Sequence, residues 1–479
     1  MFARRLSSRQ TGAALALAAM VLSGCAAGPD YVRPSLPVSA AAMASFKEGD
    51  AWRPAQPGIA DAHTPWRMLF GDRQLDALVA QANLANQSLQ QAEANYRQAQ
   101  ALVQAASAAY YPTIGIGAQA GRARSLSSGS YGENTSHGWS LQAAWKPDLW
   151  GGVRRSVEAA HASEQASEAD LAAARLAVQA AVVNDYIQLR LTDVQKELYA
   201  RTLEGYRKSL SLTEAQHRAG VVTGSDVALA QNTLAAAEAQ ATDVELSRRQ
   251  LEHALAVLVG RAPADFSLAP ASLAAALPAV PAGLPSQLLE RRPDIAGAER
   301  RAAAANAQIG VARAAWFPNL TLSASGGNTA TGLGPWLSAP TRVWSLGLAL
   351  AGVLFDGGLR QAHTEQARAA FDAAAAAYRQ TVLAAMQEVE DNLAALHELG
   401  LERAAQERAV KAAEDSVRIL MAQYRGGTTN YLSVITAQAL ALTAERTALQ
   451  LQSREFAANV ALVKALGGGW PALPVPGSL

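Results

Sequence analysis

The chain has 479 residues, of which 50% are hydrophobic and 17% charged, and its mean hydropathy is +0.02. Beyond Cys25 no uninterrupted apolar stretch reaches the roughly 18 residues of a membrane-spanning helix, so a bundle of such helices is excluded. The formal net charge of +1 gives no bulk attraction for nucleic acid, and no nucleic-acid partner is expected. Alanine supplies much of the apolar half, and together with Leu, Gln, Glu and Arg it favours extended helices.

The first segment has the pattern of a bacterial lipoprotein signal peptide. Arg4, Arg5 and Arg9 precede an apolar run over 11–22, which ends in Leu-Ser-Gly-Cys at 22–25. We therefore expect a signal peptide over 1–24, lipidation of Cys25 and a lipidated N-terminal tail over 25–71. Cys25 is the single cysteine, so it cannot form an internal disulfide. The alternatives are a plain secretory signal cut after residue 26 or 27, or a buried core cysteine.

The sequence repeats itself once. Residues 109–114 match 315–320 at an offset of 206, and 216–220 match 423–427 at an offset of 207. These matches predict a first repeat over 72–260 and a second over 286–467. The Pro- and Ala-rich stretch 261–285 is interpreted as a linker, and 468–479 as a C-terminal tail.

Within each repeat a helical pattern gives way to strand-like alternation. The pattern is helical over 72–109, and apolar residues then alternate with small or polar ones over 137–146, 319–325 and 342–350. Each repeat is expected to supply two strands of about ten residues, the length of a tilted membrane strand. Residues 125–136 and 330–341, rich in Gly, Ser, Thr and Asn, are expected to be external loops.

Tryptophans lie at or near the ends of these expected strands. Such a placement is typical of the aromatic girdle of a membrane barrel. A single hairpin would more simply pack on a soluble core, but four matched strands favour a membrane sheet. The expected girdle consists of Trp139, Trp145, Trp336 and Trp344.

A very long helical stretch follows each pair of strands. Residues 152–218 and 358–425 contain no proline, and at 1.5 Å per residue each helix would be about 100 Å long. Apolar residues spaced by three and four predict coiled-coil packing. Each stretch ends in a glycine-containing reversal, after which 225–260 and 431–467 run back. Asp226 and Asp294 are interpreted as helix-start residues rather than catalytic groups.

Four strands in one chain cannot enclose a membrane barrel, and open sheet edges are not tolerated in lipid. Several copies must therefore share one barrel. Two copies would give eight strands, whose interior is filled by side chains, whereas a duct needs a wider ring. The expected fold class is mostly α with a transmembrane β-barrel: a long α-helical coiled-coil barrel, four strands per chain and an internal two-fold repeat.

Five short motifs of the chain lie at 22–34, Arg291–Ile295, Asn430–Leu432, Ala437–Gln438 and 465–470. Together they resemble motifs of the TolC-like outer membrane factors, specifically the NodT-type lipoprotein branch. The resemblance implies a homotrimeric outer membrane channel with a twelve-stranded barrel and a periplasmic helical barrel. It further implies a periplasmic adaptor and an inner-membrane pump, commonly of the resistance-nodulation-division type. The chain would then be lipid-anchored in the outer membrane and act as a passive exit duct.

The same resemblance assigns roles to the two helix reversals. Both would be periplasmic tips that contact the adaptor and close the pore. Leu432 matches a constricting leucine, whereas Thr436 and Ala439 replace the usual acidic and basic residues. Our hypothesis is that Leu432 and Thr436 line an apolar constriction that depends less on charge than in relatives. The expected tip residues are Arg218, Gly220, Val221, Arg425, Gly426, Gly427 and Thr428.

No pattern of an enzyme site is present in the sequence. It contains no phosphate loop, no paired zinc histidines and no nucleophile elbow, so no catalytic residue, metal or cofactor is predicted. The stronger rival is a structural coiled-coil lipoprotein or adhesin without channel activity. Such a rod would share the anchor and the helices, but it would not need paired amphipathic strands. The sequence leaves the exported substrates open.

Overall fold

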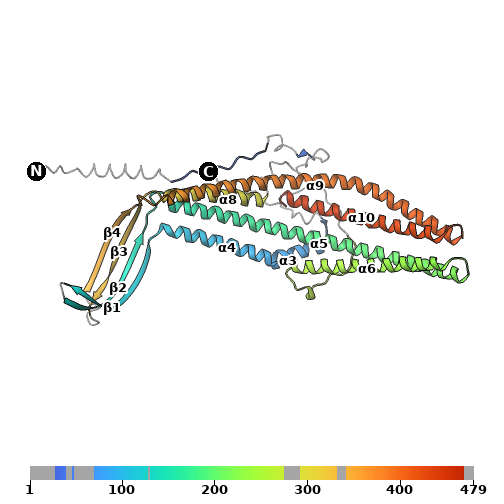
Figure 1. Cartoon of the computed structure of the whole chain (residues 1–479), viewed down its shortest axis with the longest axis horizontal. Coiled ribbons are helices and arrows are strands. Elements are labelled where there is room, and N and C mark those ends of the chain that lie inside the picture. The colour runs from blue at the N-terminus through green and yellow to red at the C-terminus, as the bar shows by residue number, and fades with distance from the viewer. Residues whose placement is uncertain are drawn as a thin grey trace. The chain divides into compact units, whose positions relative to one another are not determined.

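The computed structural model describes residues 27–38, 46–47, 70–127, 130–273, 292–331 and 341–468. Helical stretches alternate along the chain with two pairs of strands, which form one sheet (Figure 1). The expected signal peptide, Cys25, Trp336, residues 274–285 of the linker and almost all of the C-terminal tail lie outside the described residues. Two units are distinguished: Met1–Ser35, Asn95–Glu168 and Gly297–Arg379 form the first, and Leu36–Ala94, Ala169–Ala296 and Gln380–Leu479 form the second.

Helices precede the strands in both halves of the described chain. Asp72 caps α3 (Arg73–Ala85) by accepting from the Gln74 and Leu75 N–H groups. The helical pattern predicted over 72–109 is confirmed, but it forms two helices, because Asn86 is extended and α4 (Gln87–Ser107) begins after it. The Asn86 side chain accepts from Leu89 N–H and donates to the Leu258 carbonyl, which stabilises the break. The second half opens on α8 (Pro293–Ala314), and short 3₁₀ turns lie at Ala108–Tyr110 and Pro263–Asp265.

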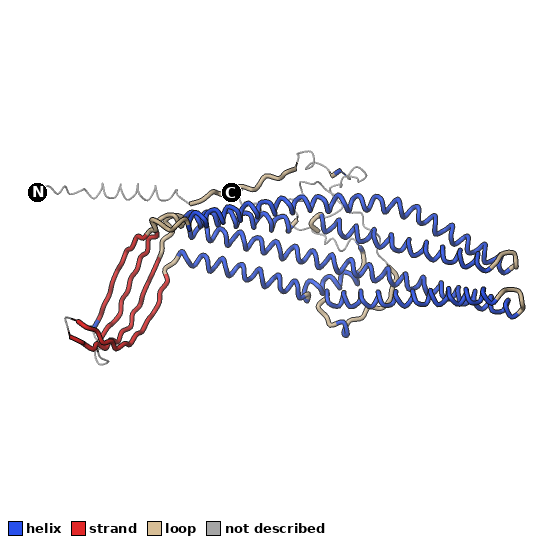
Figure 2. Tube along the Cα trace, viewed as in Figure 1, coloured by secondary structure: helices blue, strands red, loops and turns tan. Residues whose placement is uncertain are grey.

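Four antiparallel strands in the order β1-β2-β3-β4 form the sheet of the first unit (Figures 1 and 2). Their bounds are β1 Thr113–Ser127, β2 Ser130–Trp145, β3 Asn319–Ala330 and β4 Arg342–Ala351. The register pairs Thr113 with Ala144, Trp145 with Leu322, and Asn319 with Ala351. The expected external loop over 125–136 was wrong, because β1 and β2 extend through most of it.

The predicted long helices are confirmed. α5 (Gly152–Arg218) and α9 (Leu359–Arg425) have 67 residues each, while α6 (Gly224–Leu258) and α10 (Tyr431–Ala465) have 35 each. Some of the apolar residues whose spacing predicts coiled-coil packing are buried, among them Leu198 of α5 and Leu393 of α9. Among the residues that the structure describes, none of the helices combines the length and the apolar character needed to cross a membrane.

The N-terminal segment 27–38 is fixed to the first unit by polar contacts. Ala27 N–H donates to the Trp150 carbonyl at 3.0 Å. Arg155, whose side chain is 6% exposed, bonds Asp30 at 2.7 Å. Tyr31 donates its hydroxyl to Glu299 at 2.7 Å. Contacts between residues more than a hundred positions apart in the chain therefore hold this N-terminal segment, called the strap below, on the first unit.

The main apolar core lies in the second unit. Residues of α3, α5, α6, α9 and α10 form it, including Leu75, Val182, Leu255, Leu393 and Leu462. Phe266 and Leu268 from the segment that follows α6 also belong to this core. Because these side chains leave water together, their burial is the main driving force for packing the helices.

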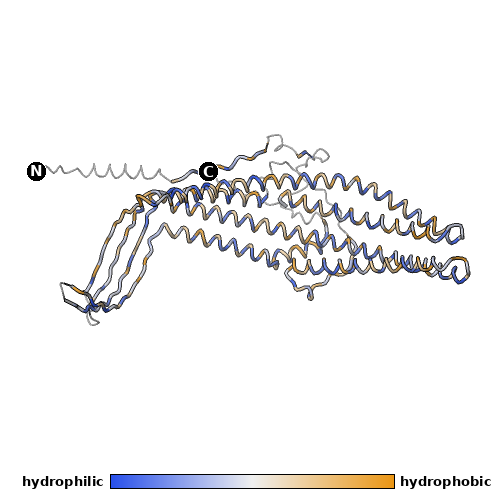
Figure 3. Tube along the Cα trace, viewed as in Figure 1, coloured by the Kyte–Doolittle hydropathy of each residue, from blue (hydrophilic) through white to orange (hydrophobic). Residues whose placement is uncertain are grey.

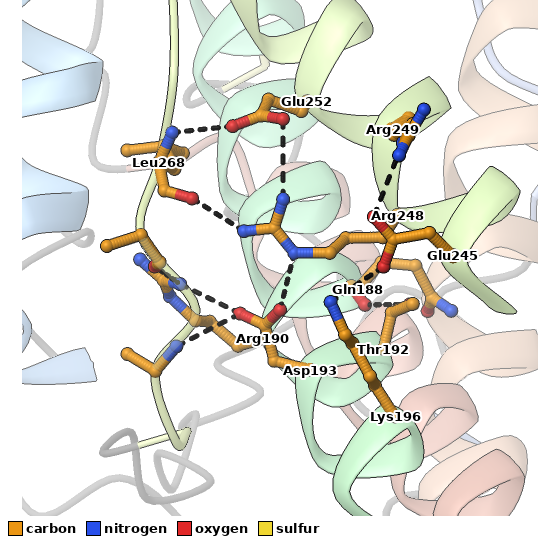
Figure 4. A network of polar contacts seen from close by, with 12 residues as sticks. Gln188, Arg190, Thr192, Asp193, Lys196, Glu245, Arg248, Arg249, Glu252 and Leu268 are labelled. Atoms are coloured by element: carbon orange, nitrogen blue, oxygen red, sulfur yellow. Dashed lines mark hydrogen bonds and ion pairs between the residues drawn. The ribbon is translucent and has the colours of Figure 1, made fainter. Parts of the chain in front are cut away.

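A buried ion network holds the segment after α6 against that core (Figure 4). Asp193 accepts from Arg190 at 2.9 Å and from Arg248 at 2.7 Å. The guanidinium of Arg190 also donates to the Ala269 carbonyl, and that of Arg248 to the Leu268 carbonyl. The network thus joins α5, α6 and residues 268–271.

Candidate functional site

The sheet presents one apolar face. Directly paired residues lie on the same face of an antiparallel sheet, so both residues of every second pair lie on this face. Apolar and polar residues are interspersed along every strand (Figure 3). Near the helices this face is continuous and exposed, with Leu348 70% exposed. Its apolar residues are Ile114, Ile116, Leu141, Ala143, Trp145, Leu320, Leu322, Trp344, Leu346, Leu348 and Leu350.

The opposite face carries glycine and small polar side chains. The hydroxyls of Ser325 and Ser345, which are cross-strand partners, lie 2.8 Å apart. Hydroxyl and amide groups retain hydrogen-bonding capacity that suits water rather than lipid. The sheet therefore separates an apolar from a polar environment. The residues of the polar face include Gly115, Gly117, Gln119, Ser140, Gln142, Thr321, Ser323, Ser325 and Ser345.

Both edges of the described sheet are open. β1 pairs only with β2, and β4 only with β3, among the strands that the structure describes. Each outer edge thus presents backbone N–H and C=O groups without a partner strand. An apolar sheet of this kind can lie in a membrane only if those edges are covered.

The expected girdle tryptophans that are described share the apolar face. Trp145 lies near the helices and donates its indole N–H to the Tyr110 carbonyl at 2.9 Å. Trp139 and Trp344 lie closer to the other end of the strands, and Trp344 is 75% exposed. Their positions at the two ends of one face fit the two membrane interfaces, at which aromatic girdles lie. The girdle stays a prediction, which the register supports.

The reversal between α5 and α6 is closed by backbone contacts (Figure 2). Gly220 has a φ of +76°, a conformation that glycine adopts without strain. Its N–H donates to the His217 carbonyl, and Val221 N–H donates to that of Gln216, both at 2.9 Å. This pattern satisfies the last carbonyls of the helix. Arg218 and Val221 remain exposed.

The reversal between α9 and α10 has the same construction. Gly427 has a φ of +72°, and its N–H donates to the Tyr424 carbonyl at 3.1 Å. Thr428 N–H donates to the Gln423 carbonyl at 3.0 Å. Asn430 then caps α10 by accepting from Ser433 N–H. Arg425, Gly426, Gly427 and Thr428 are exposed, so the predicted tip residues lie on accessible surface.

A small core joins the ends of the four long helices. Tyr424 and Tyr431 are buried with ring centroids 5.4 Å apart. The Tyr424 hydroxyl is hydrogen-bonded to Thr213 of α5 at 3.2 Å. Ala230 of α6 and Val434 of α10 complete the cluster. Sequence reasoning missed this contact, because Thr213 and Tyr424 are 211 residues apart.

The packing around this cluster is expected to loosen at alkaline pH, when its buried tyrosine ionises. Burial, with a further contribution from neighbouring Tyr424, raises the pKa of Tyr431 to about 12. Because the folded pKa lies above the ordinary value of 10.0, the packed phenol stabilises the fold fully below pH 10, and this stabilisation is lost as the pH rises through 12. Near-ultraviolet circular dichroism should show a transition in this window that Tyr431→Phe removes. Tyr111→Phe, at an exposed tyrosine of the first unit, is the control, and identical curves for all three proteins would contradict the assignment.

The two expected pore residues share an exposed face of α10. Leu432 is 57% exposed, and Thr436 lies one turn further, also exposed. The Thr436 hydroxyl donates back to the Leu432 carbonyl at 2.9 Å, so no polar side-chain partner ties it to another helix. Tyr431, Val434 and Ile435 occupy the opposite, buried face. Both residues are therefore available to face a lumen, and their role there stays a prediction.

Comparison with known proteins decides the family. Residues 78–261 and 284–468 match the model of a family described as outer membrane efflux protein. The chain belongs to this family. Membership confirms the predicted outer membrane location and the predicted role in efflux, and it favours this role over the rod or adhesin.

Individual relatives of this outer membrane efflux protein agree with the assignment. The chain is 31% identical over 463 residues to the probable efflux pump outer membrane protein TtgC of Pseudomonas putida, covering 95% of each chain. It is 31% identical to outer membrane protein OprJ of Pseudomonas aeruginosa, covering 96% of each. The solved structure of the outer-membrane channel OprN superimposes with a TM-score of 0.86 at 32% identity, covering 93% of this chain and all of that one.

Proposed function

We propose that this outer membrane efflux protein is the passive exit duct of a tripartite efflux system, built as a homotrimer. The single observation that carries the proposal is the sheet, which has one apolar face, one polar face and two open edges. Three copies with four strands each close a twelve-stranded barrel in which every edge is paired. The apolar face then meets lipid, and the polar face lines a lumen wide enough to hold water.

The long helices continue the duct on the periplasmic side as an α-helical coiled-coil barrel. An internal repeat accounts for the equal lengths of α5 and α9 and of α6 and α10. The two separate matches to one family model support the same division, with repeats over 72–260 and 286–467 and a linker over 261–285. With two repeats in each of three chains, the ring acquires pseudo-sixfold symmetry.

The partners in this proposal are a periplasmic adaptor and an inner-membrane pump of the resistance-nodulation-division type. Names such as efflux pump outer membrane protein, given to relatives, support a multi-component system. The two exposed reversals offer Arg218, Val221, Arg425 and Thr428 for contact with the adaptor. The pump supplies the energy, and the duct itself has no catalytic activity and no cofactor.

A lipid anchor at Cys25 completes the proposed membrane attachment. Ala27, two residues further along the chain, is bonded to Trp150 beside the start of α5. The strap that begins there is fixed to the unit that contains the sheet, so an acylated residue close to it would share the level of the membrane. Acylation at more than one atom would make this anchoring stable, where one chain binds only marginally.

Conductance in planar lipid bilayers tests the proposal directly. The purified full-length protein should insert and open ion-conducting pores, because a polar lumen crosses the apolar band. A coiled-coil rod or adhesin would leave the bilayer without conductance. Wild-type protein that is folded and trimeric but gives no conductance would overturn the proposal.

The same measurement tests the constriction at Leu432. Leu432→Ala removes an exposed apolar side chain from the first turn of α10, so the pore widens and the single-channel conductance rises. The control is Leu401→Ala, which shortens another exposed leucine in the middle of α9. Equal conductance of Leu432→Ala and wild type would refute the apolar constriction while leaving the duct itself intact.

A further inference from the structure

Three arginines lie on the apolar side of the sheet, on its two edge strands. Arg122 and Arg124 belong to β1, and Arg342 belongs to β4. The register places all three on the face that carries Leu141 and Leu348. All three are exposed, so cationic side chains project from the face that the proposed function gives to lipid.

Along each edge strand, the arginines lie directly beyond the last apolar or alanine position of this face. On β4, Leu350, Leu348, Leu346 and Trp344 are followed on the same face by Arg342. On β1 the apolar and alanine positions run from Ile114 to residue 120, and the next two positions on this face are the arginines. The cationic positions therefore lie at the hairpin end of the strands, away from the helices. In the proposed duct this is the level of the outer leaflet headgroups.

The charges of this region are only partly compensated within the chain. Arg122 forms an ion pair with Glu133. Arg124 lies over the ring of Tyr131, 5.0 Å from its centroid. The backbone of Arg342 pairs with Asn328, but its guanidinium has no ion pair or hydrogen bond to another residue that the structure describes. Three guanidinium groups thus face a single carboxylate.

Pairing between copies brings the three arginines to one seam. The β1–β2 hairpin begins with the pair Thr113 and Ala144, and the β3–β4 hairpin begins with the pair Asn319 and Ala351. Equivalent residues therefore differ by 206 between β1 and β3 and by 207 between β2 and β4. Within the chain, β2 meets β3 with Trp139 opposite Asn328 and His137 opposite Ala330. When the same junction is repeated between chains, Leu346 lies opposite Arg122 of the partner subunit, and Trp344 lies opposite Arg124 of the partner subunit.

Arg342 is then diagonal to Arg124 of the partner subunit, on the same face of the sheet. Like charges at neighbouring cross-strand positions repel each other. An anion between them would remove the repulsion, and phosphate accepts the paired N–H donors of guanidinium groups especially well. Trp344 beside them suits the boundary between acyl chains and headgroups.

The geometry points to a binding site for the phosphate groups of a membrane lipid headgroup at each seam between copies. Arg342 of one copy and Arg122 and Arg124 of the next hold the phosphate, while Leu346 and Leu348 contact the acyl chains below it. The site rests on the proposed function, because it is incomplete without the partner subunit. A lipid is favoured over free phosphate because the cationic positions adjoin a continuous apolar face.

Native mass spectrometry of the full-length trimer with diphosphoryl lipid A tests this site. Wild-type protein should retain the lipid, and the dephosphorylated form of the same lipid should bind far more weakly. The double substitution Arg124→Gln with Arg342→Gln should weaken binding about thirtyfold, since each arginine near an anionic membrane surface strengthens binding about fivefold. Arg418→Gln, at an exposed arginine of α9, should leave binding unchanged.

A second variant guards against failure of assembly. Arg124→Lys with Arg342→Lys keeps the charge, and binding intermediate between wild type and the glutamine variant is expected, since lysine cannot bind phosphate bidentately. Equal binding of the dephosphorylated lipid, unchanged binding by the glutamine variant, or displacement of the lipid by equimolar inorganic phosphate would each overturn the site. Conductance in phosphatidylcholine bilayers separates the two proposals. A conducting wild type that binds no lipid A refutes the site alone, whereas a trimer without conductance refutes the duct.

Discussion

Replacement of Asp193 by alanine is expected to destabilise the helical part of the protein by about 3–5 kcal/mol, the usual cost of breaking a buried ion pair. The Asp193 side chain is 5% exposed, and those of Arg190 and Arg248 are 1% and 7% exposed. Without the carboxylate, Arg190 loses its counter-ion in the interior, and Arg248 keeps only the longer pair with Glu252 at 3.3 Å. Asp193 also accepts from Ala271 N–H at 3.2 Å, so the segment after α6 loses a direct contact as well.

The neighbouring pair of Lys196 and Glu245 supplies the matched control. These side chains are 2.7 Å apart, but they are 46% and 33% exposed. A solvated pair of this kind contributes at most about 1 kcal/mol, so Lys196→Ala should change stability little. Denaturant unfolding followed by circular dichroism measures both variants. Similar stability of the two would show that the network in Figure 4 does not hold the segment after α6.

Leu348→Arg is expected to prevent stable insertion into the outer membrane. Leu348 lies in the middle of the apolar face, between Leu346 and Leu350 on β4 and opposite Leu322 on β3. An arginine on the lipid side of a barrel costs about 2–4 kcal/mol near the midplane, and in the proposed homotrimer this cost arises three times. The fraction of protein recovered in outer membranes, or folded into vesicles, should therefore fall sharply.

Ala349→Arg is the control, because it introduces the same side chain one residue away. Successive residues of a strand point to opposite faces, so this arginine enters the polar side of the sheet. The variant should insert normally and lower the conductance for cations through electrostatic repulsion in the lumen. Equal insertion of the two variants would contradict the assignment of the faces.

The long helices could be predicted closely from the sequence. α5 spans the predicted residues 152–218, and α9 begins one residue later than expected. Helix formation depends on neighbouring residues, and long stretches without proline, ended by glycine, carry that information locally.

The hairpin over β1 and β2 was predicted too short for a physical reason. Residues 125–136 are rich in Gly, Ser and Asn, which favour turns when considered alone. The two strands nevertheless stay paired through this region, with Arg122 opposite Thr135 and Leu126 opposite Tyr131. Cross-strand pairing overrides the weak local preference for a turn. The break at Asn86 was missed similarly, since its decisive partner, the Leu258 carbonyl, is 172 residues away.

The sequence by itself determined the helices, the alternation of the strands, the two glycine reversals and, through the combination of its motifs, the family. All of these depend on residues close together in the chain or on recognisable local patterns. The tertiary structure alone decided which residues of the four strands share a face, and which partners Asp193 and the tyrosine cluster around Tyr424 have. Contacts between distant segments depend on packing in three dimensions, and no spacing in a single sequence specifies them.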